Sequence, residues 1–342
     1  MNESTLAEPQ VPGVQLPRLG FLGTGWIGRH RLRAIAASGV AEIAAIGDSS
    51  AAALHELNGF APDAVRVASL DALLAQPLDG IVIATPSALH AAQSIAALAR
   101  GLPVFCQKPL ARTAAETRQV IHAARSADLL LGVDMPYRHT DAMRVLRAIV
   151  QAGELGDVYA VDVVFHNAHA PDRSWARDPE LSGGGCVMDL GVHLVDLVLW
   201  TLGFPRVTGA TSRRYAGGEL LVPGTRPVSE DYAVALLELD TGATVRLACS
   251  WNLPTGREAV IEASFYGTAG GGAFHNVNGS SYDFTAELYR GTSRHTLASP
   301  PDDWGGRAAV EWVTRVAQGE RYDPWIEGLV DVATALDGIL GR

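Results

Sequence analysis

The sequence predicts an α/β protein of two domains: a doubly wound parallel sheet, then an α+β domain with a large, mainly antiparallel open sheet. Residues 18–138 alternate short apolar runs with stretches of helical periodicity, which is typical of a parallel sheet covered by helices. The later sequence contains runs with period-two alternation, typical of strands that bury one face. The chain has 342 residues, which is long for one domain at about 150 residues each.

Composition indicates an ordinary globular protein, with 48% hydrophobic and 19% charged residues. The net charge of −10 and the lack of a basic cluster argue against a nucleic-acid partner. Three well-separated cysteines favour free thiols in a reducing compartment. Residues 1–17 are polar with three prolines, so we expect a loose arm. We see no signal-peptide pattern and no apolar run of about 18 residues, and expect a soluble, cytoplasmic protein without membrane contact.

The elements of the first domain follow in chain order. Strands are predicted at residues 18–23, 41–48, 65–69, 79–84, 102–107 and 129–134. Helices are predicted at residues 26–38, 87–100 and 113–127, where apolar residues recur at spacings of three and four. Ser87 and Thr113 are expected as N-caps, Thr113 with Glu116 as a capping box, and Gly101 is expected to stop the middle helix.

The turn between the first strand and the first helix reads GTGWIG. Glycines there allow backbone to approach a pyrophosphate, which the helix N-terminus attracts. Asp48 ends the second strand 20 residues after Gly28, where a carboxylate would hydrogen-bond the adenine ribose. Ser49 and Ser50 follow, with no base to hold a 2′-phosphate. The sequence therefore predicts NAD, with NADP less favoured, at Gly23, Thr24, Gly25, Trp26, Ile27, Gly28 and Asp48.

The fourth and fifth strands end in ATPSALH and FCQKPLA, and ligands of such sheets bind at the carboxyl ends of the strands. Lys108 precedes Pro109, which disfavours a helical backbone at Lys108 itself. An extended strand end would aim the Lys108 ammonium into the cleft.

The second half begins with a helix at residues 141–153, and its alternation is clearest at residues 244–251 and 258–266, before a closing helix at 325–340. A further helix from Cys186 to Trp200 would carry Asp189, His193 and Asp196 on one face. The remaining surface of that helix is apolar, so it is buried and its polar stripe needs a partner. A metal ion, a structural network or a reacting substrate would each satisfy it.

The order GTGWIG, TPSALH, QKP, YR and GGGCVMDLGVHLVD resembles the Gfo/Idh/MocA oxidoreductases. The resemblance covers residues 18–342 and implies an NAD-binding Rossmann domain at 18–138 and a substrate and oligomerisation domain at 139–342. It implies that Lys108, Asp189 and His193 line the active site. Gln107 stands in place of the usual Glu, Ser87 in place of a common Asn, and Ala176 in place of an Arg. Further expected cofactor contacts are Thr85, Pro86, His90, Gln107, Lys108, Asp134 and Trp175, and expected substrate contacts are Lys108, Arg138, Asp189 and His193.

Within this resemblance we favour catalysis for the stripe. Alcohol oxidation needs an acid/base group and a positive charge where alkoxide develops. His193 suits the first role, with a pKa of about 6 to 7.5, and Lys108 the second, while Asp189 would hold the substrate or the imidazolium. A zinc site of Asp189, His193, Asp196 and Cys186 is the alternative we do not favour. Asp196 belongs equally well to a structural network or to the support of His193.

These observations predict an NAD(H)-dependent dehydrogenase or reductase that acts on a CH–OH group of a sugar, cyclic polyol or sugar derivative. The substrate class comes from the resemblance. Two alternatives stay open: an NAD-retaining glycosidase that uses transient oxidation, and a non-catalytic NAD or sugar sensor on the same fold. An exposed sheet face in the second domain indicates a homodimer or homotetramer.

Overall fold

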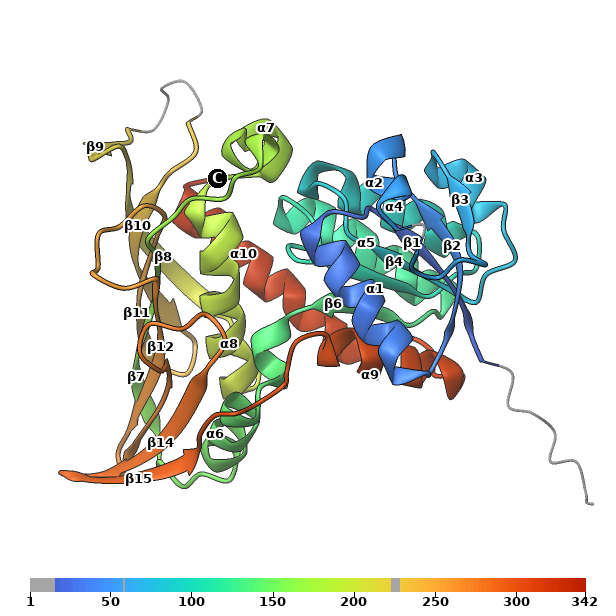
Figure 1. Cartoon of the computed structure of the whole chain (residues 1–342). Coiled ribbons are helices and arrows are strands. Elements are labelled where there is room, and N and C mark those ends of the chain that lie inside the picture. Colours follow the sequence, from blue (N-terminus) through green and yellow to red (C-terminus); the bar gives the residue numbers. More distant parts are fainter. Residues whose placement is uncertain (1–15, 58, 223–227) are drawn as a thin grey trace, which may run out of the picture.

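The computed structural model describes residues 16–57, 59–222 and 228–342, which build two sheets with helices between and around them (Figure 1). The first sheet has six parallel strands in the order β3-β2-β1-β4-β5-β6. Its strands are β1 (Arg18–Leu22), β2 (Glu42–Gly47), β3 (Val65–Val67), β4 (Gly80–Ile83), β5 (Val104–Gln107) and β6 (Leu131–Asp134). The predicted doubly wound parallel sheet is confirmed.

The helices that alternate with these strands are α1 (Trp26–Ser38), α2 (Ala51–His55), α3 (Leu70–Leu74), α4 (Ser87–Ala99) and α5 (Ala114–Ala127). The three predicted helices are present, and the two short ones, α2 and α3, were missed. Each missed helix starts after a serine, Ser50 or Ser69, whose side chain accepts a hydrogen bond from the residue three positions on. The predicted strand at 65–69 is therefore too long, because Ser69 already caps α3.

The predicted caps have different outcomes. Thr113 caps α5 by accepting a hydrogen bond from the Glu116 amide at 3.1 Å, as predicted. The Glu116 carboxylate, however, accepts from the Arg112 amide at 2.9 Å, so the capping box is displaced by one residue. The prediction of Ser87 as the N-cap of α4 was wrong, because Pro86 is the N-cap and Ser87 is the first helical residue. Gly101, at φ +79°, follows the end of α4 as expected.

The second sheet has nine strands in the order β15-β14-β13-β12-β7-β11-β10-β8-β9. The strands are β7 (Val158–Asn167), β8 (Val207–Ala216), β9 (Glu219–Leu220), β10 (Tyr232–Leu239), β11 (Thr244–Ser250), β12 (Ala259–Gly267), β13 (Gly271–Asn276), β14 (Phe284–Arg290) and β15 (Ser293–Ala298). All neighbours pair antiparallel except β7 and β11, which are parallel. The predicted mainly antiparallel sheet is confirmed.

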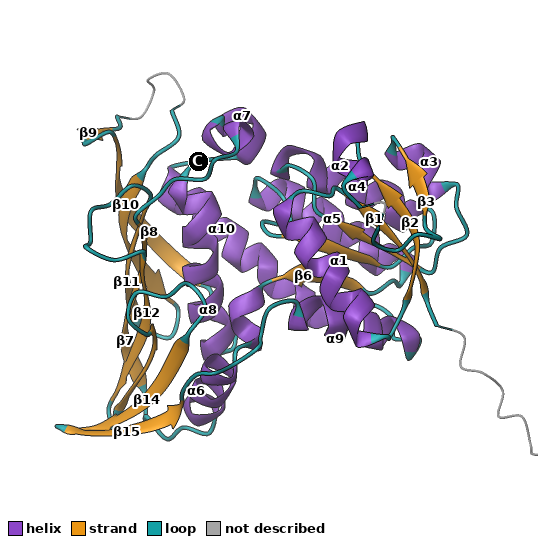
Figure 2. Ribbon diagram, viewed as in Figure 1, coloured by secondary structure: helices purple, strands orange, loops and turns teal. Residues whose placement is uncertain are grey.

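One face of this sheet is covered by α6 (Asp141–Gln151), α8 (Val192–Leu202) and α10 (Gly328–Leu340), which lie between the two sheets (Figure 2). No described helix covers the other face. The remaining elements are the short helix α7 (Pro179–Ser182), the 3₁₀ turns η1 (Pro136–His139), η2 (Ser174–Arg177) and η4 (Pro324–Glu327), and the π-helical turn η3 (Val187–Gly191). The predicted α-helix at 186–200 is thus a π turn followed by α8.

Helix α9 (Arg307–Ala317) returns to the first sheet, although it lies far along the chain. Its Trp312 packs against Phe105 of β5 with ring centroids 5.7 Å apart. It shares a buried cluster with Phe21 of β1 and Ile35 of α1, and each such side chain contributes about 1.5 to 3 kcal/mol by leaving water. The first sheet is therefore completed by a segment from the end of the sequence.

The helical stretch Pro179–Leu202 is long and apolar enough by composition to cross a membrane. In the structure, 83% of its most apolar window is buried inside the protein. This burial is the property of a core helix, as expected for a helix that is apolar on nearly every side.

Candidate active site

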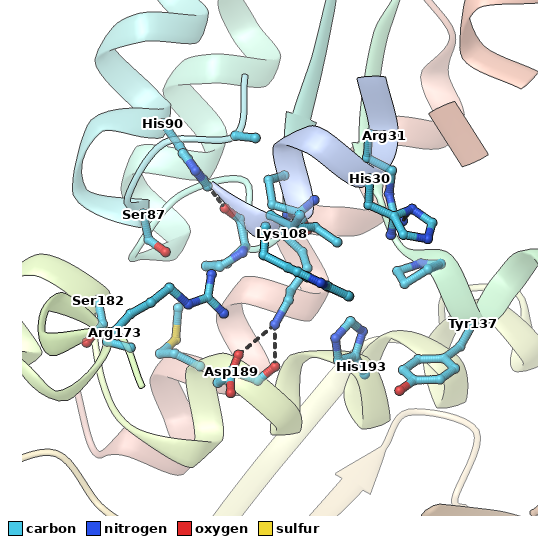
Figure 3. A pocket seen from close by; sticks show the side chains of 18 of the residues that line it. His30, Arg31, Ser87, His90, Lys108, Tyr137, Arg173, Ser182, Asp189 and His193 are labelled. Carbon is cyan, nitrogen blue, oxygen red and sulfur yellow. Dashed lines mark hydrogen bonds and ion pairs between the residues drawn. The ribbon is translucent and has the colours of Figure 1, made fainter. Parts of the chain in front are cut away.

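A cavity of about 290 Å³ lies where the carboxyl ends of β4 and β5 face the second sheet and its helices. This is the edge at which open parallel sheets bind ligands. The predicted site residues that line it are Trp26, Ile27, Thr85, His90, Gln107, Lys108, Trp175, Asp189 and His193. Figure 3 shows Lys108 reaching into the cavity from the first domain toward Asp189, with His193 beside them.

The other predicted residues do not line this cavity: Gly23, Thr24, Gly25, Gly28, Asp48, Pro86, Asp134 and Arg138. Gly23, Thr24 and Gly25 form the turn that joins β1 to α1, and Asp48, which follows β2, is hydrogen-bonded to it. Gly25 is the N-cap of α1, and no side chain caps that helix, so its first amides are available to an anion. A Cβ at Gly28 would lie 2.2 Å from the Gly23 carbonyl oxygen, so only glycine permits this close approach of helix and strand.

The Asp48 side chain holds the glycine turn between β1 and α1 by hydrogen bonds. Its Oδ2 accepts hydrogen bonds from the Thr24 amide at 2.7 Å and the Thr24 hydroxyl at 2.8 Å. Its Oδ1 accepts from the Ser50 amide at 2.8 Å. These residues fit a dinucleotide: the uncapped helix end suits a pyrophosphate, and the fixed carboxylate at the end of β2 suits ribose hydroxyls.

Lys108 and Asp189 form an ion pair across the two domains. Lys108 Nζ donates to Asp189 Oδ1 at 2.8 Å and to the Asp189 backbone oxygen at 2.6 Å. Trp251 Nε1, which sequence reasoning missed, donates to Asp189 Oδ2 at 3.1 Å. Burial alone would raise the pKa of Asp189, but the Lys108 ammonium lowers it below its ordinary value, with smaller contributions from His193 and Trp251. Asp189 is therefore a carboxylate with both oxygens occupied.

Lys108 is also the only lysine in the chain, whose other 26 basic residues among Lys and Arg are all arginine. An ammonium differs from a guanidinium because it is a compact charge with three donors on a flexible stem. Two of these protons are used by Asp189, so one donor is left for a further acceptor in the cavity.

His193 lies on α8 and is only 7% exposed. Its ring meets the Tyr137 ring edge-on, with centroids 4.9 Å apart and an interplanar angle of 89°. Within the described residues its ring nitrogens make no hydrogen bond. Burial, and then the nearby Lys108 charge, hold the pKa of His193 well below its usual range. The sequence expectation of an ordinary imidazole pKa was wrong, since it took no account of burial; His193 is neutral at neutral pH.

The polar stripe is oriented by the turn before it. Glu230, a buried residue that sequence reasoning missed, accepts hydrogen bonds through Oε1 from the Gly185 amide at 2.8 Å and the Val187 amide at 3.0 Å. Burial raises the pKa of Glu230. A Cβ at Gly185 would lie 1.9 Å from the Glu230 carbonyl oxygen. Glu230 and Gly185 thus fix the start of η3, the π turn that carries Asp189, and π turns are frequent at functional sites.

Gln107 is held by a buried ion pair. Asp134 Oδ2 accepts from Arg31 Nε at 2.5 Å and from Gln107 Nε2 at 2.7 Å, and Gln107 Oε1 accepts from the Lys108 amide at 3.1 Å. Asp134 is fully buried, so it is not brought to the cavity wall as expected. It acts on the site through Gln107, and Arg31 was missed because nothing in its local sequence marks it.

Arg138 and Asp196 point away from the cavity. Arg138 Nε donates to Asp196 Oδ2 at 2.8 Å, and the guanidinium lies 5.5 Å from the Phe204 ring centroid. The structure does not bring Arg138 together with the predicted substrate contacts, because its charge is already matched by buried Asp196. Asp196 was expected either in a structural network or as a support of His193, and its contacts with Arg138 are those of a structural network.

His90 bridges two loops of the first domain. Its Nδ1 lies 2.7 Å from the Pro109 carbonyl oxygen and its Nε2 lies 2.8 Å from the Thr85 carbonyl oxygen. Burial lowers the pKa of His90, and this effect outweighs the hydrogen bonds to the two carbonyl groups, which raise it. His90 therefore ties the loop after β4 to the loop that follows Lys108.

The side chains of the zinc alternative do not converge. Asp189 is bonded to Lys108 and Trp251, Asp196 to Arg138, and Cys186 contacts Cys249 with the sulfurs 3.8 Å apart. Among the described residues there is no group of three or more His, Cys, Asp or Glu side chains that would hold a metal ion.

Comparison with known proteins agrees with this architecture. Residues 18–135 match a family model described as the oxidoreductase family with an NAD-binding Rossmann fold, and residues 143–272 match the GFO/IDH/MocA C-terminal domain. The rhizopine catabolism protein MocA of Rhizobium meliloti is 31% identical over 253 residues, which cover 74% of this chain and 76% of that protein. Inositol 2-dehydrogenase of Gluconacetobacter diazotrophicus is 27% identical over 340 residues, 90% of this chain and 95% of the relative.

Among solved structures, GenD2 from gentamicin A biosynthesis, determined in complex with NAD, superposes with a TM-score of 0.79. The two are 24% identical, and the alignment covers 99% of this chain and 98% of that one. At this sequence identity the superposition shows a shared fold and no more. Together with the matched family models and the relationship to MocA, it leads to one conclusion: the chain belongs to the Gfo/Idh/MocA family of oxidoreductases, with an NAD-binding Rossmann domain at its N-terminal end.

Proposed function

We propose that this protein transfers a hydride between NAD(H) and a carbinol or carbonyl carbon of a sugar, cyclic polyol or sugar derivative. The observation that carries the proposal is the convergence of Lys108, Asp189 and His193 in one cavity at the carboxyl edge of the first sheet. The substrate class is supported by the names of relatives, which include an inositol 2-dehydrogenase and a rhizopine catabolism protein.

His193 is the acid/base group in this proposal. When bound, the nicotinamide accepts or gives the hydride, so the protein has to remove or return the proton of the substrate hydroxyl. His193 lines the cavity and has ring nitrogens free of partners in the described part of the chain. Its lowered pKa keeps it neutral and able to accept that proton.

Lys108 stabilises the negative charge that develops on the substrate oxygen. Two of its ammonium protons are donated to Asp189, and the third is directed to the substrate oxygen in our proposal. Asp189 holds this ammonium in place, and Trp251 holds Asp189. Asp189 therefore orients the cation and is not the base, since both its oxygens accept hydrogen bonds and its pKa is low.

We further propose NAD as the preferred cofactor, a cytoplasmic location and a homodimer or homotetramer formed through the second sheet. The uncovered face of that sheet supports the assembly, because Val164, Val234, Leu236, Ala248 and Tyr266 point outward there and are at least partly exposed. We place the domain boundary near residue 138, with α9 belonging to the first domain.

The test is steady-state formation of NADH, followed by its near-ultraviolet absorbance, with a panel of polyols and sugars. Net NADH that accumulates in proportion to oxidised product supports a dehydrogenase. An NAD-retaining glycosidase would cleave a glycoside without net NADH, and a sensor would bind NADH without turnover. Either outcome would contradict the proposal.

A further inference from the structure

One side of the cavity gathers hydrogen-bond donors that the proposed reaction does not use. Figure 3 shows Ser87 and Arg173 on the side opposite Tyr137, with Arg173 pointing inward toward Lys108. Ser87 begins α4 in the first domain, and Arg173 precedes η2 in the second. Helices α4 and α7 contact each other beside them. The two donors therefore face one region of the cavity from opposite domains.

Among the described residues that line the cavity, Arg173 has a positive charge without an acidic partner. Its guanidinium lies 5.3 Å from the ring centroid of Trp175, which supports it by a cation–π contact. Within the described residues it makes no hydrogen bond and no ion pair. The other cations of the cavity wall are both matched, Lys108 by Asp189 and Arg31 by Asp134.

Ser87 supplies a second donor, and α4 a third. Ser87 is 4% exposed and lines the cavity, and its hydroxyl makes no hydrogen bond in the described part of the structure. Helix α4 has 13 residues, and its N-cap, Pro86, provides no side-chain cap. The free amides of the first turn and the helix dipole make this end attractive to anions.

We propose that Arg173, Ser87 and the N-terminus of α4 form a subsite for an anionic oxygen group, a carboxylate or phosphate, carried by the sugar substrate. The inference rests on the proposed function and narrows its substrate class to acidic sugar derivatives. The pyrophosphate of the cofactor has its own uncapped helix end at α1. The subsite lies beside Lys108, where the reacting carbon has to be.

The charge balance of the cavity supports an anionic ligand. Asp189 is the only carboxylate among the described residues that line it, and Lys108 already neutralises Asp189. Arg173 is exposed at the cavity rim, so a neutral sugar would leave its charge to water, whereas a carboxylate accepts a bidentate pair from a guanidinium.

The experiment is calorimetric titration of the enzyme saturated with NADH. The probes are D-glucuronate, D-galacturonate and inorganic phosphate, with D-glucose and D-galactose as neutral counterparts. The variants are Arg173→Ala, Ser87→Ala and the control Arg177→Ala, which removes an arginine on η2 that does not line the cavity. We expect at least one anion to bind the wild type more tightly than its neutral counterpart. Arg173→Ala should raise its Kd about 10- to 100-fold and Ser87→Ala about 2- to 10-fold, with Arg177→Ala unchanged.

Two results would overturn the inference. One is that no anion, phosphate included, distinguishes Arg173→Ala from Arg177→Ala. The other is that Arg173→Ala weakens NADH binding by the same factor in the absence of any sugar, which would assign the guanidinium to the cofactor pyrophosphate. Because the titration compares binding to the variants, these results are distinct from a failure of the proposed dehydrogenase, which shows as absent NADH formation with every substrate.

Discussion

Glu230 Oε1 accepts a hydrogen bond from the Gly185 amide at 2.8 Å, so a buried carboxylate from the loop before β10 fixes the start of the turn that carries Asp189. The same oxygen accepts from the Val187 amide. Two helix-start amides that would otherwise be buried without partners are satisfied by this one side chain.

Glu230→Ala should lower the free energy of unfolding by about 2 to 4 kcal/mol, because it leaves two buried amides unpaired. It should also lower kcat, since Asp189 moves with the turn. Glu230→Gln keeps an oxygen acceptor and should retain most of both. Denaturant unfolding and steady-state kinetics measure the effects, with exposed Glu219→Ala in β9 as control. Equal stability of the Ala variant and the control would remove the role assigned to Glu230.

His193→Asn should lower turnover by about 10² to 10⁴ with NADH affinity nearly intact, because it removes the proton acceptor and keeps a polar side chain. The pH profile is the more specific readout. Only neutral His193 accepts a proton, and its pKa lies below 6.5, so the oxidation rate should be flat above that pH and fall as pH drops further. This acid limb should disappear in His193→Asn. A limb that persists in the variant assigns the base to another group.

Lys108→Met should lower turnover by at least about 10², because it removes the charge that stabilises the alkoxide, and should weaken NADH binding, because we expect the same ammonium to orient the nicotinamide ribose. Lys108→Arg keeps the charge but should rescue little, since a planar guanidinium cannot reproduce the two bonds of Nζ to Asp189. As the only lysine in the chain, Lys108 is the single side-chain target of amine reagents, and bound NADH should protect it. Full activity of either variant contradicts the assignment.

Asp48→Ala should weaken NAD(H) binding by about 1.5 to 3 kcal/mol, while NADP(H) binding changes little. The variant loses the carboxylate expected to bind the ribose and the bonds to Thr24 that order the glycine turn. Fluorescence titration of both cofactors measures the difference, with Asp63→Ala on the same domain as control. Wild-type affinity for NADP(H) equal to that for NAD(H) would refute the preference.

Leu236→Glu should break the proposed oligomer. Leu236 is 46% exposed on the uncovered face of the second sheet, and its cross-strand neighbour on β11, Arg246, is already paired with Asp162. A buried charge there is costly unless paired. Light scattering should report a smaller mass for this variant than for Val65→Glu, which places the same charge on an exposed position of the first sheet. A monomeric wild type would refute the proposed assembly.

Local patterns predicted the alternating strands and helices and marked Lys108, Asp189 and His193 as candidates, because strand ends and helix faces depend on neighbouring residues. The catalytic role expected of these three residues came from the family resemblance. Contacts between segments that are distant in the sequence could not be predicted from local patterns. Trp251 and Glu230 reach the site from strands or loops remote in sequence, and Arg31 finds Asp134 across 103 residues. Arg138 was assigned to the substrate because its local sequence does not reveal Asp196. The π turn was missed because its hydrogen-bond pattern has no signature in apolar periodicity.

Helix α9 sets the order in which the chain can become compact during synthesis. Trp312 fits against β6 only because Gly132 there has no side chain: a Cβ would lie 2.7 Å from the indole. Until the ribosome has made residues 307–317, the face of the first sheet that holds Phe21 and Phe105 lacks this cover. The N-terminal half therefore keeps this apolar surface exposed until nearly the last segment of the chain has emerged. A chain truncated after residue 138 keeps every strand of its first sheet and still lacks part of its core.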